Sequence, residues 1–488
     1  MNKYPLVFSI ALILTTQILM AEVRLPNIFS DGMVLQRNQP IALWGWADPH
    51  EQVKVEFRDQ KHETVADVRG KWKLALGAEE AGGPFQLIVS GKNKIILSDV
   101  LIGEVWVCSG QSNMEWNVAK SDNAKQEIAH ANYPQIRQLR IPRKTAGTPM
   151  EDISEPLEWK EASPQNVGNF TAVGYFYARE LHRELNIPIG LIHSSWGGTM
   201  IETWISKEAL AKDESLRKAI DIFEQVPADT VRKNTRPNKY PTLLFNAMIN
   251  PLIPYTVKGV IWYQGESNAR RACEYRKSFP MMITDWRERW GLGDFPFYFV
   301  QLSSYKGSGG TSAGGSTWAE LREAQHMALS LPRTGEAVTI DIGNTNDIHP
   351  RNKQDVGRRL AAIALYDSYG KNTVYSGPVY KKLSVRGAQA IVHFDHVHSG
   401  LIMKGSEGII GFEIAGADKV FYPAEAKIEG ETVVVSSSSV SEPKAVRYAW
   451  ADDPGKSNLF NIDGFPASPF RTDKWTSATE GVVYKLEI

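Results

Sequence analysis

Apolar and polar positions divide the chain into three parts that follow an apolar N-terminal segment. Over residues 22–100, short runs alternate apolar with polar side chains, which is the period of half-buried strands. Turn signals such as Asp31-Gly32 separate these runs. The pattern predicts a small N-terminal β domain, whose clearest strand candidates are 41–46, 53–57 and 85–89.

The middle part, residues 101–366, predicts a parallel β-sheet covered by helices on both faces. Strand-like apolar runs alternate there with helical stretches, in which apolar side chains recur about every four positions. The helical stretches are marked by Val173, Tyr177, Leu181 and Leu185, and by Val356, Leu360 and Ile363. The strand-like runs are 101–107, 187–192, 257–262, 297–302 and 338–342.

The last part, residues 367–488, is β-like again and is predicted to form a C-terminal β domain. Its strand candidates are 390–394 and 433–435, and the serine run 436–439 is predicted to be a loop. Glycine and serine dominate residues 307–316, which are predicted to form a mobile loop beside the functional site.

The N-terminal segment, residues 1–21, is predicted to be a secretory signal peptide. Lys3 precedes a short apolar run, and Ala21 offers a small residue at the cleavage point. A membrane anchor is the alternative, but the run is short against the roughly 20 residues that span a bilayer. We therefore expect a secreted or periplasmic protein that is free of the membrane once the segment is removed.

Charge and cysteine content narrow the function. The 488 residues contain 55 Lys and Arg and 55 Asp and Glu, so the chain lacks the basic excess of a typical nucleic-acid-binding protein. Its two cysteines, Cys108 and Cys273, have no CxxC spacing; they are predicted to be buried thiols, although pairing stays open. Three histidines, at 393, 396 and 398, are predicted to lie on a β surface, with metal binding as the alternative.

Polar motifs follow the strand candidates of the middle part, where an α/β sheet binds its ligands. Ser112 stands on a glycine-containing turn after the first run, which suits an exposed nucleophile and an oxyanion beside a helix N-terminus. Gly197 and Gly198 follow the second run and can offer backbone N–H groups, and Asn268 follows the third and can offer an amide. Each motif alone could be a helix cap or an ordinary turn.

The fifth run leads to Asp347 and His349. Pro350 favours an extended backbone at His349, so side chains two positions apart project to one side and Asp347 can orient the imidazole. The alternative is a helix entry in which Asp347 is an incidental turn residue. Taken together, the motifs supply a nucleophile, a base, an orienting acid and oxyanion donors at one edge of the predicted sheet.

In this arrangement the chain resembles the sialate O-acetylesterases, within the SGNH hydrolase superfamily. The resemblance rests on Gly110-Gln111-Ser112-Asn113-Met114, Trp196-Gly197-Gly198-Thr199, Gln264-Gly265-Glu266-Ser267-Asn268 and Asp347-Ile348-His349-Pro350. It continues into 446–450 and 464–473, so it covers nearly all of the chain after the signal segment.

The resemblance implies an α/β/α domain flanked by β domains and a metal-free, cofactor-free deacetylation of sugars. It assigns Ser112 as nucleophile, His349 as base and Asp347 as orienting acid; a backbone carbonyl is the alternative orienting group, because many SGNH enzymes space the acid and histidine differently. The oxyanion would be held by the N–H of Ser112, by Gly197 or Gly198, and by the amide of Asn268. The expected substrate-binding residues are Gln111, Trp116, Trp196, Gln264 and Glu266.

Two other functions stay open from the sequence. Acetylated xylan or xyloglucan competes with O-acetyl sialic acid as the carbohydrate substrate. A carbohydrate-binding protein without activity would make use of the 14 tryptophans for sugar stacking. Such a binding module, however, has no need of serine, histidine and aspartate at one edge of a sheet.

Overall fold

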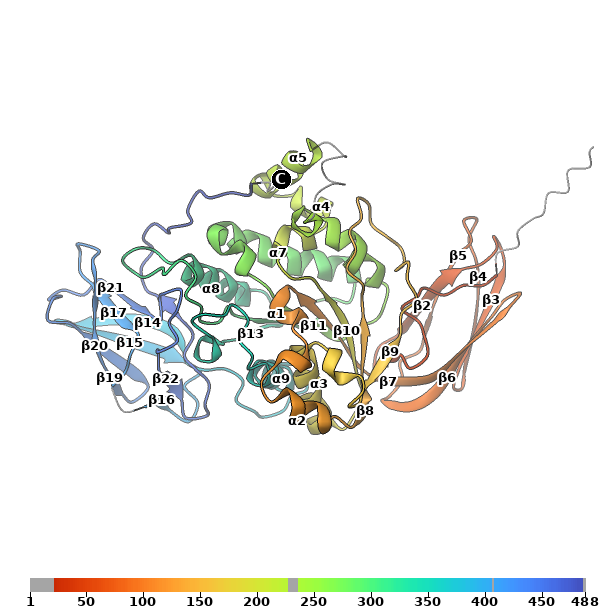
Figure 1. Ribbon diagram of the computed structural model, residues 1–488, viewed down its shortest axis with the longest axis horizontal. Helices are drawn as coiled ribbons and strands as arrows, with labels where there is room; N and C mark the ends of the chain where they lie inside the picture. Colours follow the sequence, from red (N-terminus) through yellow and green to blue (C-terminus); the bar gives the residue numbers. More distant parts are fainter. Residues whose placement is uncertain (1–21, 227–235, 406–407, 486–488) are drawn as a thin grey trace, which may run out of the picture.

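The computed structural model describes residues 22–226, 236–405 and 408–485. The predicted signal peptide, residues 1–21, lies outside these ranges. Figure 1 shows three parts in a row: N-terminal strands at the right, a central sheet with helices above and below it, and C-terminal strands at the left. Among the described residues, no helix is both long and apolar enough to cross a membrane.

The N-terminal part consists of short strands that pair antiparallel, except for β1, which runs parallel to β7. β2 pairs with β5, and β3 pairs with β4 and β6. Apolar and polar residues alternate as predicted: in β2, every second side chain is buried. The predicted runs 41–46, 53–57 and 85–89 lie in β2, β3 and β6. The strands are β1 (Val34–Gln36), β2 (Ile41–Trp46), β3 (Gln52–Phe57), β4 (Gln60–Val65), β5 (Lys71–Leu76) and β6 (Gly82–Ser90).

One long strand, β7 (Lys94–Gly110), joins the N-terminal part to the central sheet. Its first half pairs with β6 and has mostly exposed or half-buried side chains. Its second half is completely buried and pairs with two strands of the central sheet. The predicted boundary at residues 100/101 therefore falls inside a continuous strand, at the point where the chain becomes buried on both faces.

The central sheet has the order β13-β12-β11-β7-β10-β8-β9. Every neighbouring pair is parallel except β8 and β9, so the predicted parallel sheet is confirmed, with an antiparallel edge strand added. The strands that follow β7 are β8 (Tyr133–Arg140), β9 (Trp159–Ala162), β10 (Ile189–Ser195), β11 (Gly259–Tyr263), β12 (Phe297–Val300) and β13 (Thr334–Ala337).

Helices cover both faces of this sheet (Figure 1). On one face, α3 (Ala172–Leu185) and α9 (Gln354–Asp367) pack against Trp106 and Cys108 of β7. On the other, α7 (Ala272–Trp290) packs against Trp262 of β11 within a second apolar cluster. The predicted helical periods lie in α3 and α9. The other α-helices of the described residues include α1 (Ser112–Glu115), α2 (Ala124–Ala129), α4 (Lys207–Leu210), α5 (Glu214–Glu224) and α8 (Thr317–Met327).

The predicted strand over 338–342 is wrong. The edge strand β13 ends at Ala337, and residues Ile340–Ile342 form a 3-10 turn instead. The charged residue in this run explains the difference, because Asp341 pairs with Arg359 of α9 at 2.7 Å and leaves the sheet. Strands β8 and β9 were not predicted, since their sequences contain charged and polar residues that interrupt any apolar run.

The C-terminal part contains a four-stranded sheet of order β14-β15-β20-β19 and another of order β18-β17-β21-β23. The predicted runs 390–394 and 433–435 lie in β15 and β20. His396 and His398 follow the end of β15 in left-handed turn conformations, so their predicted place on a strand is wrong. The strands are β14 (Val379–Arg386), β15 (Gln389–Asp395), β16 (Leu401–Met403), β17 (Phe412–Ala415), β18 (Phe421–Pro423), β19 (Glu425–Glu429), β20 (Thr432–Ser436), β21 (Ala445–Tyr448), β22 (Leu459–Asn461) and β23 (Phe470–Arg471).

A buried arginine and a buried aspartate attach the C-terminal part to the centre. Arg322 of α8 donates to the carbonyls of Ser303 and Asp452, at 2.9 Å each. The Asp452 carboxylate accepts hydrogen bonds from the backbone N–H groups of Ser308 and Gly310, at 3.0 and 2.9 Å. The glycine-rich loop predicted to be mobile is thus hydrogen-bonded to the C-terminal part.

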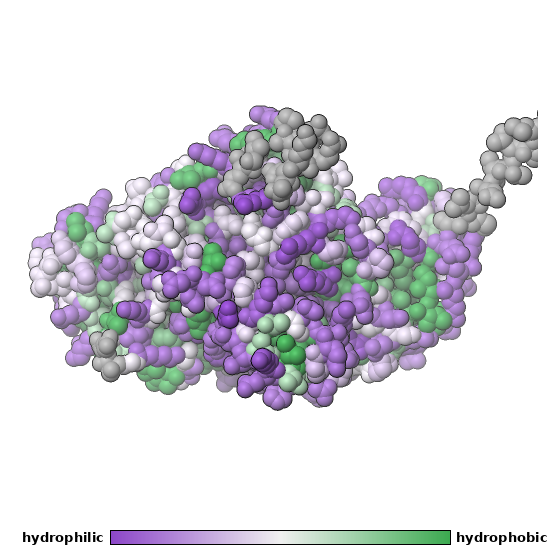
Figure 2. Space-filling model, in the orientation of Figure 1, coloured by the Kyte–Doolittle hydropathy of each residue, from purple (hydrophilic) through white to green (hydrophobic). Residues whose placement is uncertain are grey.

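The surface differs between the parts. Figure 2 shows a mainly hydrophilic face over the central part and a larger apolar area over the N-terminal strands at the right. A cavity of about 1010 Å³ lies against the paired strands β2 and β5, and Trp44, Trp46 and Leu74 are among its lining residues.

Candidate active site

The nucleophile candidate stands directly after β7. Gly110 closes the strand with a φ of +133°, and a side chain there would come within 2.2 Å of the Tyr263 carbonyl oxygen. Only glycine fits such an approach. Ser112 follows as the first residue of α1, where the backbone N–H has no acceptor within the helix.

The structure brings Ser112 and His349 together across 237 residues of sequence. His349 Nε2 lies 2.9 Å from Ser112 Oγ, a hydrogen-bond distance. The indole ring of Trp116 stacks on the imidazole, with ring centroids 5.2 Å apart and 15° between the planes. Trp116, predicted from the sequence to bind substrate, is therefore placed to fix the orientation of the imidazole.

Asp347 lies beside the imidazole at a longer distance. Its Oδ1 is 3.6 Å from His349 Nδ1, which suits an ion pair and exceeds a hydrogen bond. The same oxygen accepts the backbone N–H of His349 at 2.9 Å, so Asp347 fixes the turn that carries the base. Within the described ranges, no backbone carbonyl accepts a hydrogen bond from His349 Nδ1.

The environment favours a neutral His349. Partial burial lowers the pKa of its imidazole below the ordinary value; the charge of Asp347 opposes this shift, and that of Lys353 adds to it. A neutral imidazole can accept the proton of Ser112. Because the pKa is lowered, the imidazole stays neutral, and can accept this proton, at a lower pH than an ordinary histidine.

A buried polar cluster, formed by Asn113, Glu266 and Lys353, holds the histidine turn against α1. The Asn113 amide donates to Glu266 Oε1 at 2.6 Å and to the Ile348 carbonyl at 3.0 Å. Lys353 Nζ donates to Asn113 Oδ1 at 2.6 Å. Asn113 follows Ser112 in sequence and Ile348 precedes His349, so this cluster sets the spacing of nucleophile and base.

Burial shifts both ionisable members of this cluster towards neutrality. It lowers the pKa of Lys353 to about 7, although Glu266 opposes the shift. It raises the pKa of Glu266, whose Oε2 is buried without a hydrogen-bond donor from the described parts of the chain. Glu266, predicted to bind substrate, thus accepts a hydrogen bond from Asn113, the residue that follows Ser112.

The glycine turn after β10 contacts the nucleophile directly. A side chain at Gly197 would lie 3.2 Å from Ser112 Cβ. The Gly197 N–H, however, donates to Glu115 Oε2 at 3.0 Å, and Arg143 Nε donates to the other oxygen of Glu115 at 2.7 Å. Gly198 is exposed with a φ of +72°, and its N–H has no acceptor among the described residues.

The amide of Asn268 is not directed at Ser112. Its nitrogen donates to Glu202 Oε2 at 3.2 Å, and its oxygen accepts from the backbone N–H of Ile201 at 2.9 Å. Gln264 is fully buried and donates to the same Asn268 oxygen at 2.7 Å. Both side chains tie the turn after β11 to residues 199–202, and Asn268 is engaged where the sequence predicted a free donor.

Gln111 is the other amide beside the nucleophile. Its oxygen accepts the backbone N–H groups of Gly265 and Ser267, at 3.3 and 3.5 Å. Its nitrogen has no hydrogen-bond partner in the described portion of the chain, although the residue is only 3% exposed. Trp196, also predicted to bind substrate, lies half-buried with Arg143 5.8 Å from its ring centroid.

Lys353, Glu115 and Arg143 are the site residues that sequence reasoning missed. Lys353 stands at the start of a helix, which is an ordinary place for a lysine in a sequence. Only the structure distinguishes it, because its side chain is completely buried. Glu115 accepts the backbone N–H of Gly197, a contact between two separate motifs.

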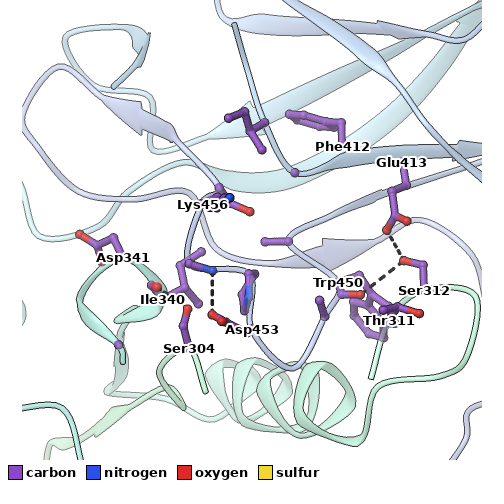
Figure 3. A pocket seen from close by; sticks show the side chains of 18 of the residues that line it. Ser304, Thr311, Ser312, Ile340, Asp341, Phe412, Glu413, Trp450, Asp453 and Lys456 are labelled. Atoms are coloured by element: carbon purple, nitrogen blue, oxygen red, sulfur yellow. Dashed lines mark hydrogen bonds between the residues drawn. The ribbon is translucent and has the colours of Figure 1, made fainter. Parts of the chain in front are cut away.

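A further cavity, of about 540 Å³, lies between the central and C-terminal parts (Figure 3). Its wall includes Gly343 and Thr345, from the segment leading to His349, and Trp450 from the C-terminal part. Figure 3 shows Ser312 donating to Glu413 across its rim. Ser112 and His349 do not line it, so it is separate from the reacting atoms.

The other candidate reactive groups have different surroundings. Cys108 is buried in the core and Cys273 is half-buried, and both are free thiols. Burial raises the pKa of Cys108, so it stays a thiol. In the described residues, no three histidine, cysteine, aspartate or glutamate side chains gather to hold a metal ion.

Known proteins share this chain's sequence over most of its length. The family described as carbohydrate esterase, sialic acid-specific acetylesterase, matches residues 102–366. The sialate O-acetylesterase of Homo sapiens is 33% identical over 493 residues, covering 92% of each chain. That of Mus musculus is 32% identical, covering 88% of this chain and 90% of its own.

A solved structure extends the agreement to the fold. The carbohydrate acetylesterase of Xanthomonas citri is 44% identical, covers 93% of this chain and 100% of its own, and superposes with a TM-score of 0.86. The predicted fold class, an SGNH-type α/β/α arrangement with flanking β regions, is thereby confirmed. The protein is an esterase that hydrolyses acetyl esters of carbohydrates, and the chain belongs to the sialic acid-specific acetylesterase family of carbohydrate esterases.

Proposed function

We propose that the protein removes acetyl groups from sialic acids by a serine-based acyl-enzyme mechanism, with Ser112 as nucleophile and His349 as base. The observation that carries the mechanism is the 2.9 Å contact between Ser112 Oγ and His349 Nε2 at the carboxyl edge of the sheet. The sialic acid assignment is supported by the names of the relatives. Acetylated xylan is the alternative substrate.

In the first step, Ser112 Oγ attacks the acetyl carbonyl carbon while its proton passes to His349 Nε2. The bond to the sugar oxygen then breaks, and the sugar hydroxyl leaves with the proton from His349. A water molecule, deprotonated by His349, then attacks the acetyl-serine carbonyl. The bond to Ser112 Oγ breaks, acetate leaves, and His349 returns the proton to Ser112 Oγ. The imidazolium that forms in both steps lies 3.6 Å from Asp347, whose charge stabilises it.

The oxyanion would be stabilised by the backbone N–H groups of Ser112 and Gly198, both of which are free to donate among the described residues. The Gly197 N–H can contribute once Glu115 turns away from it. Asn268 would have to release Glu202 to serve in this role. The free amide nitrogen of Gln111, which lies one residue from the nucleophile, is a further candidate donor.

The substrate ring would contact the half-buried aromatic faces of Trp116 and Trp196. Gln264 and Glu266 would act indirectly, by holding the turns around the nucleophile. We also propose that the chain is exported, on the basis of the signal peptide pattern in residues 1–21. Mass spectrometry of the mature protein from its native host would then find Glu22 as the first residue.

The decisive experiment is a substrate panel with the wild-type protein and Ser112→Ala. Acetate release from O-acetyl sialosides and from acetylated xylan oligosaccharides is measured together with sugar chain length. We expect the wild type to release acetate faster from the sialosides, to leave the chains uncut, and to lose this activity in the variant. Faster release from xylan would favour the alternative substrate, and full activity of Ser112→Ala would exclude the mechanism.

A further inference from the structure

A basic cavity lies directly beside the proposed catalytic base. Its volume is about 760 Å³, which is within the range of sites for small ligands. One wall is Trp116, whose indole stacks on the His349 imidazole. Arg351, two residues after His349, forms another part of the wall. The cavity therefore shares a side chain and a loop with the acyl site.

The charges that line this cavity are all positive. Lys120, Lys125 and Arg351 are exposed, and none of them forms an ion pair with a residue that the structure describes. Asp122 and Glu127 lie in the same segment but do not line the cavity. The Glu127 carboxylate is already paired with Arg179. Among the described residues, no carboxylate lines the cavity or forms an ion pair with these three cations.

We propose that this cavity binds the carboxylate of an acidic sugar while the acetyl ester of the same glycan lies at Ser112. The proposal rests on the proposed function and adds the requirement for a negative charge. Arg351 offers paired N–H donors that match a carboxylate, and the two lysines add point charges. The side chains of Asn123 and Gln126 line the same wall and can bond sugar hydroxyls.

The position of the cavity decides which part of a glycan reaches it. Trp116 both lines the cavity and stacks on His349, so a sugar packed against the indole would carry its substituents to both sites. The carboxylate can belong to the acetylated sugar itself, as in a sialic acid, or to a neighbouring uronic acid. A neutral glycan would leave the three cations without a negative charge opposite them, although Lys120 already lies 5.5 Å from the ring centroid of Trp116.

The test is inhibition of 4-nitrophenyl acetate hydrolysis by sugars that carry no acetyl ester. N-acetylneuraminic acid and glucuronic acid are each compared with their own carboxyl methyl esters. We expect at least one acid to inhibit the wild type at a concentration at least tenfold lower than its methyl ester. Lys125→Ala/Arg351→Ala should bring the two inhibition constants together, whereas Lys382→Ala/Arg386→Ala, which removes two exposed cations of β14, should keep them apart.

The sugar that shows the effect identifies the source of the carboxylate. Equal inhibition by acid and ester in the wild type, no inhibition by either, or an unchanged preference in Lys125→Ala/Arg351→Ala would overturn the proposal. Failure of the proposed function is scored separately, by acetate release from sugar acetates. An enzyme that prefers the acid as inhibitor but releases no acetate from glycans would contradict the proposed function and leave the cavity assignment standing.

Discussion

At the scale of single residues, the site is built from pairs that lie far apart in sequence and meet at hydrogen-bond distance. Ser112 and His349 face each other, and Asp347 fixes the backbone of the base more closely than its ring. Most nearby amides and carboxylates have a definite partner, whereas the Gln111 amide nitrogen has none among the described residues. This difference separates residues that can act on substrate from those that hold the site together.

The pKa of His349 predicts the acid limb of the activity profile. A base must be neutral, and burial lowers the pKa of this imidazole below its ordinary value of about 6.5. Activity should therefore persist as the pH falls through about 6.5 and decline only below it. The measurement is kcat/KM for 4-nitrophenyl acetate between pH 4 and 8 (roughly the range in which histidine titrates). An acid limb centred above the ordinary histidine pKa would contradict this account.

Replacement of Lys353 should shift the acid limb of the pH–activity profile. Its charge lowers the pKa of His349, so Lys353→Met should move the acid limb to higher pH. It should also lower kcat, because Asn113 loses the donor that orients it. Lys371→Met, an exposed lysine, serves as the control and should leave the profile in place. A fall in kcat with an unmoved limb would assign Lys353 a purely structural function.

Gln111 and Asn268 are expected to have different functions: the Gln111 amide donates to the oxyanion, whereas the Asn268 amide is structural. Gln111→Ala should lower kcat by about 10² with little change in KM, as for loss of one oxyanion donor. Asn268→Ala should instead lower the melting temperature, because Ile201, Gln264 and Glu202 lose a buried partner worth about 1–3 kcal/mol. If Asn268 serves the oxyanion as the sequence predicts, its variant will lose kcat at an unchanged melting temperature.

At the scale of elements, the site depends on how strands end. β7, β10 and β11 are neighbours in the sheet, so the turns that follow them meet at one edge. This arrangement could be predicted from the sequence, because Ser112, Gly197 and Gln264 each follow an apolar run. It did not reveal β8 and β9, whose charged residues break the pattern, or the turn at 340–342, which a contact with α9 determines.

The same limit applies to the site. Spacing and motif order predicted Ser112 and His349, since both follow strand candidates, and the structure places their side chains 2.9 Å apart. They could not show that the Asn268 amide binds Glu202 or that Asn113 binds Lys353, because those contacts join segments 66 and 240 residues apart. Such pairings depend on three-dimensional packing. The recurrence of apolar side chains every two or four residues predicts strands and helices but not these contacts.

Gly110 tests the strand end directly. In Gly110→Ala, the new methyl group would lie 2.2 Å from the Tyr263 carbonyl, so β7 and β11 must separate and Ser112 must move. We expect a kcat at least about 10²-fold lower, as for a displacement of about 1 Å in an active site, and a lower melting temperature. Gly147→Ala, where nothing lies within 4 Å, should change neither. Full activity of Gly110→Ala would show that the turn tolerates displacement.

At the scale of the whole molecule, the flanking β parts are joined to the centre by buried contacts. β7 is shared with the N-terminal part, and Arg322 binds the turn at Asp452 of the C-terminal part. Burial lowers the pKa of Arg322 to about 9. The C-terminal segment returns across α8, where Thr479 bonds to Glu320. The relatives match this chain over nearly its full length, which agrees with one integrated structure.

Asp452 should control the glycine-rich loop. Asp452→Asn removes the charge that accepts the N–H groups of Ser308 and Gly310, so we expect a loss of about 1–3 kcal/mol in stability and faster proteolysis within 306–316. Limited proteolysis followed by mass spectrometry locates the cuts. Asp453→Asn is the matched control, since Gly455 is the only described residue that donates a hydrogen bond to its carboxylate. Equal proteolysis of both variants would contradict a specific role of Asp452.

The central claim is that Ser112 is the nucleophile and that His349 activates it. The most direct measurement is peptide mapping by mass spectrometry after treatment with a serine-directed fluorophosphonate, with residual esterase activity followed in the same samples. The account predicts one phosphonylated residue, Ser112, formed in proportion to the loss of activity, and labelling slowed by orders of magnitude in His349→Ala. Complete inactivation with Ser112 unmodified, or undiminished labelling of Ser112 in His349→Ala, would contradict it.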